Sequence, residues 1–278
     1  MKYQFLLLFL CVSFTNLYAQ KPDIKDITKK INSEEESRFY VKGYLDYGLA
    51  APNSFKGIAN LSPNSVFKTS QKGWGQGLKI GIGGGFIIND FINFGLDIDY
   101  FLSPKIESSA TVSTAKLATV FNGQILAFTP NVTFKAIQNV DFYPYCRVGA
   151  TVGVPFGMTN TTDTQDGNKF TQSVYTYKAS PAFGYIAALG VRKSLSPGFK
   201  LFAEIQANNL TIQPKSASLT TYQINGEDKL SVLTTAQKEI IYTDNANTTA
   251  NPNSATQSGK TPFLVSRLCL QLGFTFRF

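Results

Sequence analysis

The sequence predicts an all-β chain that closes into an eight-stranded, antiparallel, up-and-down transmembrane β-barrel. Three observations lead to this prediction. The C-terminal segment alternates apolar and polar residues almost without interruption, about eight segments share this period of two, and long and short connections alternate between them. A strand with one face toward lipid and the other toward a closed polar interior has this pattern.

The first 19 residues have the composition of a secretory signal peptide. Lys2 supplies a positive charge, an apolar stretch runs from Phe5 to Phe14, and a cleavage site lies near Ala19. The apolar stretch is shorter than the roughly 20 residues that a membrane-spanning helix needs. We therefore expect export, loss of residues 1–19, a periplasmic N-terminal segment over residues 20–37 and a barrel domain over residues 38–278.

Eight segments of period two follow, each bounded by turn-forming residues. In the first, Val41 and Leu45 share one face and Lys42 and Asp46 share the other. We expect strands over Arg38–Ala50, Gln76–Asn89, Phe91–Leu102, Phe121–Ala136, Phe142–Val154, Ser180–Lys193, Phe199–Asn209 and Phe263–Phe278.

The last strand has the clearest alternation. One face carries Ser266, Leu268, Leu270, Leu272, Phe274, Phe276 and Phe278, and the other carries Arg267, Cys269, Gln271, Gly273, Thr275 and Arg277. After Ala19 no stretch is long and apolar enough to span a membrane as a helix, and the mean hydropathy is only -0.05. Because only alternate residues of a barrel strand face lipid, a low hydropathy fits a barrel.

The connections support the same fold. Short turns are expected at Asn89-Asp90, around Ile137–Asp141 and at Ser194–Gly198, and long loops over residues 51–75, 103–120, 155–178 and 211–262. This parity places both ends of the barrel on the periplasmic side. Within the last loop, Asn225-Gly226 predicts a hairpin turn.

Aromatic residues are expected in two belts at the membrane interfaces. The periplasmic belt would contain Phe39, Phe86, Phe134, Phe142, Phe199, Phe276 and Phe278, and the outer belt Tyr47, Tyr100, Phe121 and Phe263. Pro130, Pro144 and Pro181 lack the amide donor of a strand ladder, so we expect them near strand ends, at bulges, or where the predicted strand boundaries are wrong.

Three segments resemble the small OmpA/OmpX-like outer-membrane β-barrel family, in a form common among Bacteroidota-type sequences. They are Phe274-Thr275-Phe276-Arg277-Phe278, Thr129-Pro130-Asn131-Val132-Thr133-Phe134 and Tyr143-Pro144-Tyr145-Cys146-Arg147-Val148-Gly149. The resemblance implies a Gram-negative outer-membrane location. It also implies that Phe274, Phe276 and Phe278 form the sorting signal that the barrel-assembly machinery recognises.

The sequence offers little catalytic chemistry. It contains no histidine, so Ser-His-Asp, Cys-His and His-metal chemistry are excluded. Asp97 and Asp99 share a lumenal face, but such carboxylates more often pair with basic neighbours. Cys146 and Cys269 fall on opposite faces, which argues against a disulfide. We expect no enzyme activity, no cofactor and no metal.

The lumenal face carries many charges, for which two interpretations remain open. An eight-stranded barrel is only wide enough for side chains to fill its interior. Arg147, Glu204, Arg192, Asp97, Lys42 and Asp46 would then form a buried charge network that closes the lumen. The alternative is a narrow, porin-like channel for small solutes.

The long outer loops are the other candidate for function. Lys56, Lys68 and Lys72 could contact lipopolysaccharide phosphates, or could be ordinary surface lysines. The formal charge of +8 is spread over loops and lumen without a basic helix, so nucleic-acid binding is not expected. We expect a monomer in the lipid of the outer membrane that serves envelope structure or surface interaction, with an unidentified ligand at its loops.

Overall fold

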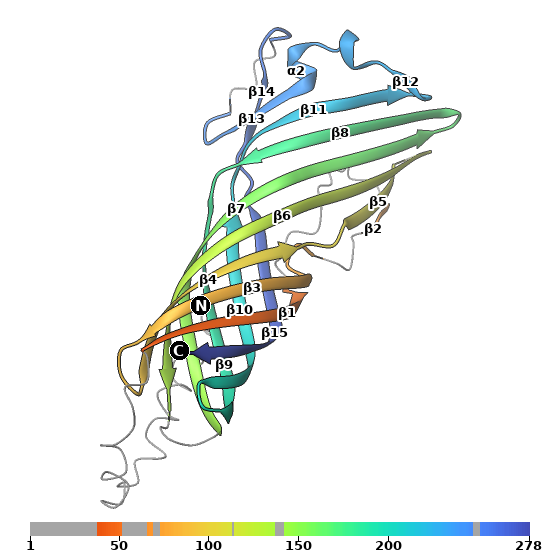
Figure 1. Ribbon diagram of the computed structural model, residues 1–278. Coiled ribbons are helices and arrows are strands. Elements are labelled where there is room, and N and C mark those ends of the chain that lie inside the picture. The colour runs from red at the N-terminus through yellow and green to blue at the C-terminus, as the bar shows by residue number, and fades with distance from the viewer. Residues whose placement is uncertain (1–37, 52–65, 69–72, 113, 137–141, 247–250) are drawn as a thin grey trace, which may run out of the picture.

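The described residues form one sheet that closes on itself (Figure 1). The computed structural model describes residues 38–51, 66–68, 73–112, 114–136, 142–246 and 251–278. In this part of the chain, eight antiparallel strands make the barrel: β1 (Phe39–Ala50), β3 (Gly77–Ile87), β4 (Ile92–Leu102), β6 (Ala115–Lys135), β7 (Phe142–Asp166), β9 (Ala182–Ser196), β10 (Phe199–Ile212) and β15 (Phe263–Arg277). Because β15 pairs with β1, the ring is complete, and the predicted fold class is confirmed.

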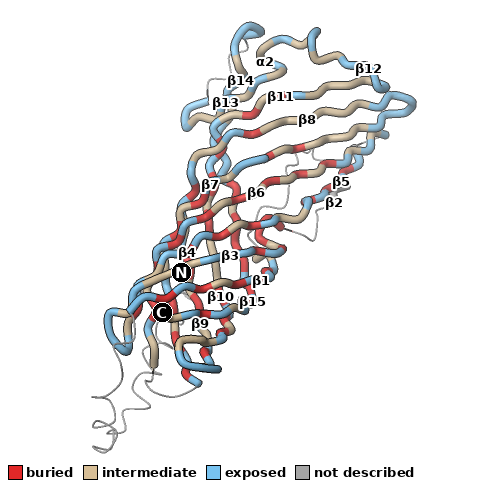
Figure 2. The backbone as a smooth tube through the Cα atoms, viewed as in Figure 1, coloured by how far each residue is buried: buried red, intermediate tan, exposed pale blue. Residues whose placement is uncertain are grey.

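The register places apolar side chains outside the barrel and polar ones inside. Leu45 pairs with Leu272, and Asp46 pairs with Gln271. Leu272 is 56% exposed, whereas Gln271 is fully buried. Figure 2 shows the same alternation of buried and exposed residues along the barrel strands. An apolar exterior around a polar interior is the arrangement of a transmembrane barrel.

One end of the barrel, here called the turn end, carries the short connections. At the β3–β4 turn the Asn89 side chain accepts hydrogen bonds from the amides of Phe91 and Ile92, both at 2.8 Å. At the β9–β10 turn Gly198 has a φ of +77°, which favours glycine, and its carbonyl accepts a bond from the Arg277 amide at 2.7 Å. The predicted turn over residues 137–141 lies outside the described residues.

The opposite end, here called the extension end, differs from the sequence prediction. β5 (Ile106–Val112) pairs with the outer part of β6, β8 (Lys169–Ala179) with the outer part of β7, and β11 (Pro214–Ile224) with β8. The loops predicted over residues 103–120, 155–178 and 211–262 are therefore largely strands. Residues 159–166 are Thr, Asn, Asp and Gln, so they lack the apolar alternation that reveals a strand.

The extension continues beyond β11 (Figure 1). The predicted hairpin is confirmed by the pairing of β11 with β12 (Glu227–Asp228), with Asn225 at φ 51° and Gly226 at φ 83°. The residues that follow form a 3-10 helix, η3 (Leu230–Val232), not a second long strand.

Four further short elements complete the extension. They are α2 (Thr235–Lys238), β13 (Glu239–Thr243), β14 (Thr256–Gly259), which pairs with β13 in parallel, and β2 (Val66–Lys68), which pairs with β5. None of the helices in the described ranges is long and apolar enough to cross a membrane.

The prolines follow the expectation at two of three positions. Pro144 is the third residue of β7, and Pro181 lies between β8 and β9. Pro130 lies inside β6, where the ladder to β7 is interrupted at Thr129 and Pro130 without a change of register. The hydroxyl oxygens of Thr129 and Thr151 are 3.0 Å apart and form a hydrogen bond across this interruption. Pro130 therefore lies neither at a strand end nor at a bulge, contrary to the expectation, and a side-chain bond bridges the gap in the ladder.

Candidate functional site

Arg147 lies in the lumen between carboxylates from two other strands. Its Nη1 is 2.6 Å from Asp97 Oδ2. It also forms an ion pair with Glu204, to which its Nε donates a hydrogen bond at 3.2 Å. The Tyr145 hydroxyl donates to Glu204 at 2.7 Å, and Lys42 Nζ is 2.8 Å from Asp97 Oδ1. These contacts join β1, β4, β7 and β10 across the lumen.

A second group of charges continues the network. Lys79 Nζ is 2.9 Å from Asp46 Oδ2 and 3.2 Å from Asp99 Oδ1. Asp46 also forms an ion pair with Arg267, and the Tyr44 hydroxyl donates to Asp99 at 2.8 Å. All of these side chains are buried. Buried charges are tolerated when they are paired in this way.

Lumenal glycines make room for these side chains. A Cβ on Gly81 would be 2.1 Å from Tyr44 Cε2, and one on Gly190 would be 2.7 Å from Glu204 Cγ and from Tyr145 Cζ. The absence of a side chain at these lumenal positions therefore leaves space for the large side chains opposite.

The structure brings together five of the six residues predicted for the network. They are Lys42, Asp46, Asp97, Arg147 and Glu204. Arg192 has no carboxylate within 4.0 Å among the described residues, so the expected ion pair of Arg192 is wrong. The register places Arg192 beside Tyr143 on β7 and Phe202 on β10, and its guanidinium lies 4.9 Å from the centre of the Tyr145 ring.

Three residues outside that predicted set complete the network: Lys79, Asp99 and Arg267. All three are buried on the lumenal face, but the alternation of a strand gives no height along the lumen and therefore no partner. With them, four cations face four carboxylates, so the ion-paired layer carries no net formal charge.

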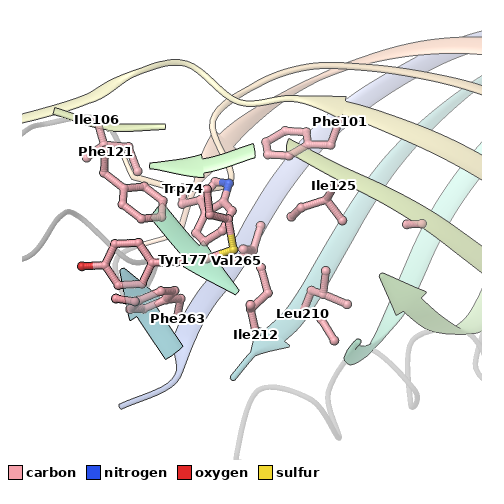
Figure 3. Packing of buried hydrophobic residues seen from close by; sticks show 14 residues of the cluster. Trp74, Phe101, Ile106, Phe121, Ile125, Tyr177, Leu210, Ile212, Phe263 and Val265 are labelled. Atoms are coloured by element: carbon pink, nitrogen blue, oxygen red, sulfur yellow. The ribbon is translucent and has the colours of Figure 1, made fainter. Parts of the chain in front are cut away.

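An apolar cluster fills the lumen on the side of the extension end (Figure 3). Trp74, which lies in the connection between β1 and β3, is 0% exposed. Its ring centre is 5.0 Å from that of Phe121 and 6.2 Å from that of Phe263. Phe101, Ile125, Met158, Leu210, Ile212 and Val265 surround these rings. The lumen is therefore polar and ion-paired in one part and apolar in the next.

Phe121 and Phe263 had been predicted in the outer aromatic belt, and this prediction is wrong. Both are buried in the lumenal cluster, whereas Tyr47, from the same predicted belt, is 54% exposed. Phe263 is separated by an even number of residues from Cys269 and Gln271, which are lumenal. The alternation of β15 therefore predicts the lumenal face for Phe263.

Tyr177 of β8 reaches the same cluster from the extension. Its ring centre is 6.2 Å from that of Phe121, and it stacks on Tyr242 of β13 at 6.5 Å. Burial raises the pKa of Tyr177 and of Tyr242 above the ordinary value for tyrosine. The extension is thereby joined to the mouth of the barrel.

The remaining predicted residues lie at the two ends. Phe274 and Phe276 have exposed side chains on the outer face of β15, and Phe278, which follows β15, is also exposed. The rings of Phe276 and Phe278 are in edge-to-face contact at 5.4 Å. Lys68 is the last residue of β2, and Lys56 and Lys72 lie outside the described residues. The signal peptide and the segment 20–37 also lie outside them.

The described ranges offer no group of three or more His, Cys, Asp or Glu side chains that could hold a metal ion. Cys146 and Cys269 are not joined by a disulfide. Cys269 is buried in the lumen, where its thiol lies 3.3 Å from the Gln206 carbonyl.

No protein-family model matches the chain, and no curated protein matches it. Among solved structures, the chain is similar to the outer membrane protein OprG from Pseudomonas aeruginosa, at 12% identity and a TM-score of 0.46, over 87% of this chain and 97% of that one. It is also similar to Neisserial surface protein A, at 14% identity and a TM-score of 0.43, over 88% and 100%. A third similar structure is that of outer membrane protein W of E. coli, at 8% identity and a TM-score of 0.35, over 88% of this chain and 100% of that one. The fold assignment rests on the strand pairing described above.

Proposed function

We propose that this chain is a non-enzymatic β-barrel of the outer membrane with a side-chain-filled lumen, and that it serves envelope structure or surface interaction through its extension. The observation that carries the proposal is the filling of the lumen. The ion pairs of Arg147 with Asp97 and Glu204 cross one level, and the rings around Trp74 occupy another.

The exterior of the barrel supports a membrane location. On β15 the side chains of Leu268, Leu270 and Leu272 are each more than half exposed, and a belt of exposed phenylalanines surrounds the turn end. β15 has 15 residues, more than the roughly 9–11 that cross a bilayer as a tilted strand. The short connections support an orientation with the turn end in the periplasm and the extension outside the cell.

The extension has the properties of an interaction surface and not of a second core. Its outer strands are rich in Thr, Ser, Asn and Gln, and polar side chains bond to each other across neighbouring strands. Gln172 Nε2 donates to Asp163 at 2.9 Å, and the hydroxyls of Thr176 and Thr220 are 3.5 Å apart. A sheet that is polar on its exposed faces can present hydrogen-bonding groups while the barrel holds it in place.

The competing function is a narrow channel for small solutes. Planar-bilayer recordings of the refolded protein distinguish the two. A filled lumen predicts no reproducible conductance steps, whereas regular open steps would overturn the proposal. A heat-dependent shift in gel mobility shows that the recorded protein is folded.

Several partners belong to the same proposal. We expect contact with outer-membrane lipid, with lipopolysaccharide near Lys56, Lys68 and Lys72, and with the barrel-assembly machinery during insertion. A monomer is expected, because the closed ring of strands leaves no barrel edge for another chain.

A further inference from the structure

The lumenal cations fall into two groups along the barrel. The ion-paired layer uses four of them and is balanced by four carboxylates. The other four lumenal cations are Lys135, Arg192, Lys200 and Arg277. They lie near the turn-end termini of β6, β9, β10 and β15. Positively charged side chains are therefore concentrated at one mouth of the lumen.

Arg192 is the most deeply placed member of this group. It is 7% exposed, and its guanidinium lies over the rings of Tyr145 at 4.9 Å and Phe202 at 5.9 Å. Its Nε has no hydrogen-bond partner. Its side chain interacts with the phenols of Tyr143, Tyr145 and Tyr40, and the interaction with Tyr143 includes a side-chain hydrogen bond. A buried guanidinium without a carboxylate is costly unless an anion joins it.

The other cations lie around the same opening. Lys200 Nζ is 5.6 Å from the centre of the Tyr143 ring. Lys135 Nζ donates a hydrogen bond to the Asn89 carbonyl at 3.4 Å, and its charge is repelled by those of Arg192, Lys200 and Arg277. Thr275, which pairs with Lys200 in the strand register, is buried and its hydroxyl has no hydrogen-bond partner. Asp90, in the β3–β4 turn, is the carboxylate that acts on Lys135.

We propose that the turn-end mouth of the lumen, formed by Lys135, Arg192, Lys200 and Arg277, is a binding site for an oxyanion, either a phosphate or a carboxylate. A planar guanidinium with a free donor, ammonium groups and a hydroxyl are the groups that hold such anions. The apolar cluster around Trp74 fills the lumen toward the other end, so the anion enters from the turn end. Binding at this mouth does not depend on whether the lumen conducts.

Two sources of the oxyanion are available. One is free phosphate in solution. The other is the run Glu34-Glu35-Glu36 of this chain, which precedes Tyr40 by four residues or more. Tyr40 pairs with Arg277 in the β1–β15 register. Four residues span up to about 13 Å, so these carboxylates are within reach of the mouth.

Calorimetric titration of the refolded protein with inorganic phosphate at low ionic strength tests the proposal. The variants are Lys200→Gln, Arg192→Gln and the triple change Glu34→Gln, Glu35→Gln and Glu36→Gln. Lys260→Gln is the matched control, because Lys260 lies in the extension and pairs with Asp244 at 2.7 Å. Heat-dependent gel mobility checks that each variant is folded, and Lys200→Gln keeps the test valid if Arg192→Gln does not fold.

Two results support the site. In the first, the wild type binds phosphate, and the affinity falls about fivefold or more in Lys200→Gln but not in Lys260→Gln; this result assigns the site to a free oxyanion. The loss of one unit charge near the anion has about this effect on affinity. Binding that appears only after the triple change assigns it to the chain's own carboxylates. The proposal is overturned if neither the wild type nor the triple variant binds phosphate, or if Lys200→Gln leaves the affinity unchanged.

Discussion

The substitution Glu204→Gln tests the lumenal network most directly. The Glu204 side chain is 1% exposed, forms an ion pair with Arg147 and accepts a hydrogen bond from Tyr145 at 2.7 Å. Glutamine has nearly the same shape and can still accept one of these bonds, so the change removes a charge and creates little space. The network then carries one unpaired positive charge.

The expected cost follows from the partners that remain. Breaking a buried ion pair costs about 3–5 kcal/mol. Arg147 keeps Asp97 at 2.6 Å, but Asp97 is shared with Lys42 at 2.8 Å, so the compensation is partial. We expect a loss of about 3 kcal/mol in the free energy of unfolding. At an m-value of about 2 kcal/mol per M, the urea midpoint in lipid vesicles would fall by about 1.5 M.

Two further variants control this measurement. Glu227→Gln makes the same chemical change in an exposed pair with Lys229 at 2.7 Å, and it should leave the midpoint unchanged. The double variant Arg147→Met with Glu204→Gln restores a balance of charges, so it should lose less stability than the two single changes together. A midpoint for Glu204→Gln equal to that of the wild type would refute the argument that the pair supports the barrel.

Three other predictions concern packing and ionisation. Gly81→Ala should lower the free energy of unfolding by about 1–3 kcal/mol, because the new methyl group meets the Tyr44 ring, whereas Gly259→Ala, in open space, should be neutral in the same urea titration. Trp74 is the single tryptophan of the chain, so intrinsic emission should shift to shorter wavelength on refolding and resist acrylamide quenching; emission typical of an exposed indole would contradict its burial. The folded-state pKa of Tyr177 is raised, so its stabilising contribution is fully present below about pH 10 and is lost as pH rises toward the folded pKa. Tyr177→Phe should reduce this alkaline loss in the free energy of unfolding. If the wild type and Tyr177→Phe lose the same free energy of unfolding between pH 9 and 12, the hydroxyl is not buried.

The barrel strands were predictable because lipid imposes a regular pattern on them. In β1 and β15 each change of face is marked by a change of polarity, so period, parity and closing partner all follow from local residues. The lumenal face of Arg147 and Glu204 followed in the same way. Their contact depends on the stagger between β7 and β10, which are not adjacent in the sheet.

The outer strands and the apolar cluster were not predictable on these grounds. Residues 159–166 of β7 have polar side chains on both faces, so nothing in their pattern distinguishes a strand from a loop. Trp74 lies in a connection without alternation, and a single aromatic residue there could face lipid, water or the lumen. Its place follows from the space that Gly123 leaves beneath it.

The amino-acid sequence by itself determined that the chain closes into a membrane-type barrel and which charged side chains of the strands face the lumen, because the constraint of lipid acts on every second residue. The tertiary structure alone decided which of those side chains meet. Depth along the lumen depends on the stagger of distant strands, and this stagger pairs Arg147 with Glu204, leaves Arg192 among aromatic rings and brings Trp74 into the mouth.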